Sequence, residues 1–109
     1  MNLNEYQELS IKHSKVRMPE GIMSLMILGL GISGEAGEVS DIIKKVARDS
    51  KSHSFTPEQI EEFSLELGDV LFYVANLAAA AGVSLEEVGQ DNIDKLKYIV
   101  EREGQRWVK

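Results

Sequence analysis

Residues 56–82, TPEQIEEFSLELGDVLFYVANLAAAAG, decide the fold class of this 109-residue chain. Pro57 fits the first helical position after the cap Thr56, and Gln59 completes a capping box. An apolar stripe follows at a helical period, and Gly82 after the alanine run is a typical residue to end the helix. The stripe consists of Ile60, Phe63, Leu67, Val70, Leu71, Val74 and Leu77. The stretch therefore predicts one long amphipathic helix that begins at Pro57 and ends just before Gly82.

Three further stretches show the same periodicity, so the whole chain is predicted to be helical. Helices are expected over 3–16, over 20–48 and from Ser84 onward, where a second capping box opens the last helix. The polar, irregular segment 49–55 is the clearest candidate for a loop in the sequence. We find no alternating strand pattern and no internal repeat. The simplest assembly is an all-α, antiparallel four-helix bundle that forms a single domain over 1–109.

Glycines complicate the second predicted helix. Gly29, Gly31, Gly34 and Gly37 fall within nine residues, and each costs roughly 1 kcal/mol relative to alanine inside a helix. One interpretation is a kink, or a break into two helices near 30–33. The other is close packing of backbone or ligand at this point, and both can hold together.

The same glycines also match G-x-G-x-x-G, the fingerprint of dinucleotide-binding folds, over Gly29 to Gly34. That fold needs a parallel sheet with strands that alternate with helices. Residues 56–103 instead predict two capped helices, so we reject a dinucleotide-binding domain.

Composition narrows the function classes. The net charge of −6 argues against broad nucleic-acid binding, which needs a basic surface. The N-terminus lacks the basic and apolar regions of a signal peptide. The longest apolar run, 21–32, is too short to cross a bilayer. We therefore expect a cytoplasmic protein that engages neither membrane nor nucleic acid.

Four acidic residues form two matched pairs, Glu35 with Glu38 and Glu66 with Asp69. Each pair has i,i+3 spacing, which places both carboxylates on one helix face. A single i,i+3 pair of acidic residues on a helix usually faces water. Here the second pair borders the apolar stripe, and four converging carboxylates would repel one another strongly unless a hard cation lay among them. We predict Mg²⁺ at this site, with Mn²⁺ as an alternative, and hence phosphate chemistry.

Cationic and amide groups near the acidic pairs are candidates for binding a phosphate. Lys45 follows Glu38 by about two turns, and Asn92 and Lys95 share a face of the last helix. Each has an equally plausible interpretation as a solvated surface residue. His13 and His53 are isolated, and the absence of E-x-x-H argues against a ferritin-like di-iron bundle.

The combination of GEAGEVSDIIKK, LELGDVLFYVANLA and DNIDKLK resembles the MazG-like family of all-α nucleoside triphosphate pyrophosphohydrolases. The resemblance covers about residues 5 to 102. It implies that Glu35, Glu38, Glu66 and Asp69 hold Mg²⁺ against a triphosphate, and that Glu35 or Glu38 orients the attacking water. The implied products are a nucleoside monophosphate and pyrophosphate, which suits house-cleaning of noncanonical or surplus nucleotides.

The resemblance also implies substrate contacts and an oligomer. Tyr73 matches an aromatic position that contacts nucleotide in relatives, and Asn92 and Lys95 match an N-x-x-K motif near substrate. Dimers or tetramers are expected. Two alternatives stay open: a non-catalytic helical dimerisation module, and a pyrophosphohydrolase of the same fold that acts on a phosphoribosyl nucleotide. The sequence does not specify the preferred base.

Overall fold

The computed structural model describes residues 1–14, 21–52 and 54–103, and four helices account for most of them. The helices are α1 (Leu3–Lys12), α2 (Ile22–Asp49), α3 (Pro57–Ala80) and α4 (Leu85–Glu103). None of the described residues belongs to a β-strand. The predicted all-α class with four helices is therefore confirmed.

Local capping signals set the helix ends. The Asn2 side chain accepts a hydrogen bond from the Glu5 backbone N–H at 2.8 Å and caps α1. Thr56 and Gln59 form the predicted reciprocal capping box at the start of α3. Gly82 follows α3 with φ near 80°, a left-handed conformation that disfavours any residue with a Cβ. These local signals set where α1 begins and where α3 begins and ends.

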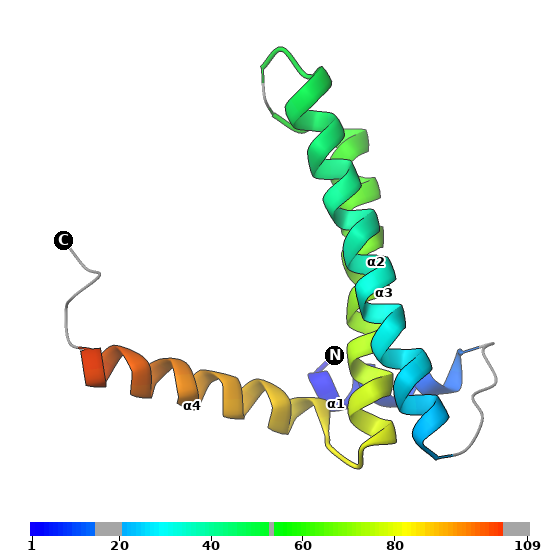
Figure 1. The fold of residues 1–109 in the computed structure, drawn as a ribbon, viewed down its shortest axis with the longest axis vertical. Coiled ribbons are helices and arrows are strands. Elements are labelled where there is room, and N and C mark those ends of the chain that lie inside the picture. Colours follow the sequence, from blue (N-terminus) through cyan, green and yellow to red (C-terminus); the bar gives the residue numbers. More distant parts are fainter. Residues whose placement is uncertain (15–20, 53, 104–109) are drawn as a thin grey trace.

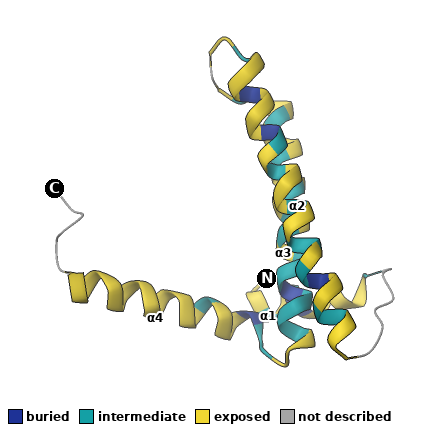
Figure 2. Cartoon of the chain, in the orientation of Figure 1, coloured by how far each residue is buried: buried dark blue, intermediate teal, exposed yellow. Residues whose placement is uncertain are grey.

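The dominant packing unit is the antiparallel pair of α2 and α3, with α1 lying across α3 near its C-terminal end (Figure 1). Among the residues that the structure describes, five apolar side chains are buried, and they lie along the hairpin and at its base: Leu28, Ile42, Val46, Ala75 and Leu85 (Figure 2). The helix α4 contacts α1 and α3 but, among the described residues, not α2. It extends away from the hairpin, and its residues 91–103 are exposed within the described part of the chain.

The glycine cluster does not break α2. The helix runs without interruption from Ile22 to Asp49, so a break into two helices near residues 30–33, which was part of one of the two interpretations, is wrong. Packing of α2 along α3 supplies most of the stability of such a helix, and it outweighs the intrinsic cost of the four glycines.

Helix ends differ slightly from the sequence prediction. α1 ends at Lys12, with His13 as its C-cap, instead of continuing to residue 16. The predicted end of the first helix at residue 16 and the predicted start of the second at residue 20 fall within residues 15–20, which lie outside the described residues, as does His53.

Candidate metal centre

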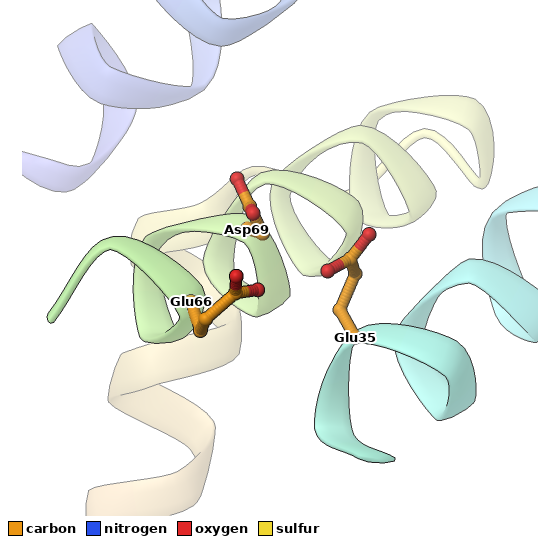
Figure 3. A group of neighbouring side chains, drawn as sticks. All are labelled: Glu35, Glu66 and Asp69. Atoms are coloured by element: carbon orange, nitrogen blue, oxygen red, sulfur yellow. The ribbon is translucent and has the colours of Figure 1, made fainter. Parts of the chain in front are cut away.

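Carboxylates of Glu35, Glu66 and Asp69 converge between α2 and α3 (Figure 3). One oxygen from each residue lies within 4.8 Å of the others. Glu35 extends from α2 across the gap, and Glu66 and Asp69 are one turn apart on α3. Glu35 and Glu66 are half-buried, whereas Asp69 is exposed. Negative oxygens from two helices thus share one small volume that is open to solvent on one side.

The secondary structure explains why these three residues meet. The i,i+3 spacing puts Glu66 and Asp69 on one face of α3. The antiparallel hairpin brings the middle of α2 level with the middle of α3, so Glu35 reaches the same level from the other side. The convergence therefore depends on the length of the hairpin and on its loop.

The carboxylates of this cluster repel one another. Partial burial raises the pKa of the Glu66 carboxyl above its usual value, and the charges of Asp69, Glu35 and Glu38 raise it further. Among the described residues, none of these carboxylates has an ion-pair partner. The described salt bridges instead involve Asp41 and Asp49, nearer the C-terminal end of α2. Carboxylate oxygens are the ligands that Mg²⁺ and Mn²⁺ prefer, so this set of three donors from two helices fits either ion.

Glu38 occupies a different place from the other three carboxylates. It is exposed and does not belong to the three-residue cluster, although its charge is near enough to raise the pKa of Glu66. The structure therefore brings three of the four predicted ligands together and leaves Glu38 at the edge of the site.

The predicted phosphate-binding residues are dispersed. Lys45 is exposed and pairs with Asp41 at 3.0 Å, towards the loop end of α2. Tyr73 is half-buried between α2 and α3, beside the cluster. Asn92 and Lys95 are exposed on α4, and α4 does not run along the hairpin. Of these four residues, the structure places only Tyr73 next to the carboxylates.

A second tyrosine was not predicted for this site. Tyr6 on α1 is half-buried, and burial together with the charge of Asp69 raises the pKa of its phenol. Its proximity to Asp69 follows from the packing of α1 on α3, which periodicity alone does not reveal. The pairing of α1 with α3 would have been the necessary signal.

The raised pKa of Glu66 predicts a pH dependence of stability in the metal-free protein. The folded state binds this proton more tightly than the unfolded chain does, so the contribution favours folding at low pH and is lost as pH rises through the folded pKa. We expect the Tm difference between wild type and Glu66→Gln to grow in favour of the variant from pH 4.5 to pH 7. Thermal unfolding in a chelator measures this. A difference that does not change with pH would contradict the expectation, and saturating Mg²⁺ is expected to abolish or reverse it.

The comparison with protein-family models identifies a family for this chain. The family model described as the MazG nucleotide pyrophosphohydrolase domain matches residues 24–103, which include all but the first two residues of α2 and all of α3 and α4. The chain is also similar to the Gene 37 protein of Mycobacterium phage L5, with 41% identity over 78 residues that span 72% of this chain and 68% of the relative. No solved structure matches the chain. The family match spans both helices that carry the carboxylates.

Proposed function

Because this chain belongs to the MazG nucleotide pyrophosphohydrolase domain family, we propose that it hydrolyses nucleoside triphosphates to a nucleoside monophosphate and pyrophosphate in the presence of Mg²⁺. The observation that carries the proposal is the convergence of Glu35, Glu66 and Asp69 without a cationic partner among the described residues. Removal of surplus or noncanonical nucleotides is the role that best suits this reaction.

Each carboxylate has a distinct role in the proposal. Glu35, Glu66 and Asp69 would hold the metal ion, which when bound neutralises phosphate charge and activates water. Glu38, exposed at the edge of the cluster, is free to orient the attacking water and accept its proton. Water adds to one phosphorus of the α–β anhydride, and the bridging oxygen leaves with the other phosphorus.

Tyr73 supports this arrangement from the neighbouring turn of α3. Its ring lies between the two helices, next to the carboxylates and against α2. An aromatic face at the side of a phosphate site can stack on a base without selecting its identity by hydrogen bonds. We therefore assign Tyr73 to the nucleoside end of the substrate and leave base preference to the substrate panel below.

A substrate panel tests the proposed reaction directly. Pyrophosphate release is measured with Mg²⁺, with Mn²⁺ and in a chelator across ribo- and deoxyribonucleoside triphosphates, and the nucleotide product is identified. The expected product is the monophosphate, with no turnover in the chelator. Release of orthophosphate with a diphosphate product would contradict the proposal. Turnover of a phosphoribosyl nucleotide alone would favour the alternative substrate class.

A second measurement separates the enzyme from a non-catalytic dimerisation module. A ligand that binds only the folded state must raise Tm. We expect Mg²⁺ together with a non-hydrolysable triphosphate to raise Tm well above the effect of Mg²⁺ alone. A module whose acidic residues only solubilise its surface predicts no such shift.

We also propose that the protein is a homo-oligomer. Its accessible surface of 8475 Å² exceeds the roughly 6,000 Å² expected for a compact monomer of 12.1 kDa. Large apolar side chains are exposed on all four helices, including Leu30 at 71%, Leu65 at 69% and Val100 at 60%. The excess is enough for a standard interface, which buries about 800 Å² on each partner. A dimer or tetramer would cover these faces.

A lipid surface fits the same exposed faces less well. By length and composition alone, α2 and α3 could each cross a membrane. However, α2 carries Glu35 and Glu38 and α3 carries Glu66 and Asp69, and ionised carboxylates inside a bilayer are rare and costly. We therefore propose a second copy of this chain as the partner. Cytoplasmic localisation stays a prediction.

An oligomer also explains how Asn92 and Lys95 would contact the substrate. Asp69 lies roughly 17 Å from the Ala80 end of α3, and Lys95 lies about 15 Å along α4, at about 1.5 Å per residue. Because α4 points away from the hairpin (Figure 1), we propose that these two residues contact a nucleotide held by another subunit.

Subunit mixing tests this arrangement. Glu66→Gln and Lys95→Ala are each expected to lower activity as homo-oligomers. When the two variants are unfolded and refolded together, a mixed dimer contains one site with an intact cluster and an intact α4 from its partner. We expect recovery of about a quarter of wild-type activity if dimers form at random. Recovery no greater than the sum of the separate variants would show that Lys95 does not act across subunits.

A further inference from the structure

Gly31 differs from the other glycines of α2 in what surrounds it. A Cβ placed on Gly31 would overlap the ring of Tyr73, at its Cδ1, Cε1 and Cζ atoms. At Gly29, Gly34 and Gly37 the corresponding space is open, with no atom within 4 Å. The aromatic ring of Tyr73 therefore lies directly against the backbone of α2, at the one glycine that leaves room for it.

This contact lies beside the carboxylate cluster. Gly31 precedes Glu35 by one turn of α2, and Tyr73 follows Asp69 by one turn of α3. Since the helices are antiparallel, the ring and the glycine form the layer next to the carboxylates, about 5.4 Å along the hairpin. The neighbouring Phe72 ring also contacts Tyr73 edge to face, with centroids 5.3 Å apart and planes at 87°.

Backbone conformation does not explain a glycine at this position. The helix α2 is continuous through residue 31, and the described glycines with positive φ are Gly21 and Gly82. In a regular helix, alanine is favoured over glycine. The room that Gly31 leaves for the Tyr73 ring is therefore the physical reason for glycine here.

We infer that Gly31 is a positioning residue, which acts through Tyr73 to hold α2 and α3 at the separation that lets Glu35 meet Glu66 and Asp69. The distance between packed helices depends on the side chains at their contact. A Cβ at residue 31 must either expel the ring or separate the helices, and both changes move Glu35 relative to α3. The inference rests on the proposed metal-dependent function and adds a residue that touches neither metal nor substrate.

Four variants test this role: Gly31→Ala, the matched control Gly29→Ala, Tyr73→Ala and the double variant Gly31→Ala with Tyr73→Ala. Binding of Mn²⁺ is measured by calorimetry, and Tm and helicity are measured without metal. Gly29→Ala gains helix propensity in open space and is expected to raise Tm while leaving Mn²⁺ affinity unchanged. Gly31→Ala is expected to lower Tm and to weaken Mn²⁺ binding about 10- to 100-fold, as loss of a supporting residue commonly does.

The double variant identifies the cause of the loss. If the loss arises from the Tyr73 ring, adding Gly31→Ala to Tyr73→Ala is expected to change Mn²⁺ affinity less than twofold, because no ring remains to be displaced. An undiminished loss in the double variant would overturn the inference, as would equal Tm and affinity changes in Gly31→Ala and Gly29→Ala. Failure of the wild-type protein to bind Mn²⁺ would instead overturn the proposed function, and the Tm comparison would still test the fit between ring and glycine.

Discussion

Replacing Glu66 with glutamine is expected to lower pyrophosphate release about 10²- to 10³-fold, the scale lost when a group that stabilises developing charge is removed. The variant keeps the size of the side chain and one oxygen but loses the negative charge that lies within 4.8 Å of carboxylate oxygens of Glu35 and Asp69. Steady-state measurement of pyrophosphate with a saturating triphosphate and Mg²⁺ gives the effect on kcat.

The same substitution is expected to have opposite effects on stability with and without metal. In a chelator, Glu66→Gln removes a half-buried charge that three neighbouring carboxylates repel, so Tm should rise. With Mg²⁺, the wild-type protein should gain Tm and the variant should gain little. This crossing pattern separates a metal ligand from a residue that matters only for folding.

Glu61→Gln provides the matched control. Glu61 is exposed on the same helix and does not belong to the carboxylate cluster. Its activity and its response to Mg²⁺ should match those of the wild-type protein. If Glu61→Gln and Glu66→Gln behave alike, the acidic residues act through net charge, and the proposed site is wrong.

Much of the fold could be predicted because its determinants are local. The capping box of Thr56 and Gln59 and the stop at Gly82 are read within a few residues, and the structure has each of them. The meeting of Glu35 with Glu66 and Asp69 was also predictable, since i,i+3 spacing and an antiparallel hairpin suffice.

Other features depend on contacts that no local pattern records. A glycine that would break an isolated helix is tolerated when the neighbouring helix fills the space, as Tyr73 does at Gly31. The direction of α4 depends on how its first turn joins α1 and α3, so the remoteness of Lys95 could not be read from the periodicity of α4. The proximity of Tyr6 to Asp69 likewise depends on the packing of α1.

That junction of α1, α3 and α4 contains a buried amide, besides the exposed hydrogen bonds between Asn4 and Glu86 that also join α1 to α4. Gln7 Nε2 donates to the carbonyls of Ala75 at 3.0 Å and Val83 at 3.1 Å, and Gln7 Oε1 accepts from the Leu85 N–H at 3.1 Å. The side chain thus joins α1 to the end of α3 and to the first residue of α4. Both ends of the amide are used, so no apolar side chain can replace it.

Gln7→Leu is expected to lower the free energy of unfolding by roughly 2–4 kcal/mol, because it leaves the Val83 carbonyl and the Leu85 N–H without their side-chain partner. For a chain of this size, each kcal/mol corresponds to about 4–8 °C in Tm. Gln90→Leu is the control, since Gln90 is exposed and bonds only to the Asp94 side chain among the described hydrogen bonds; it should change stability by less than about 0.5 kcal/mol. Urea unfolding of both variants measures the difference. Equal stabilities would mean that the α1–α3–α4 junction depends on apolar packing around Leu85 and not on the amide.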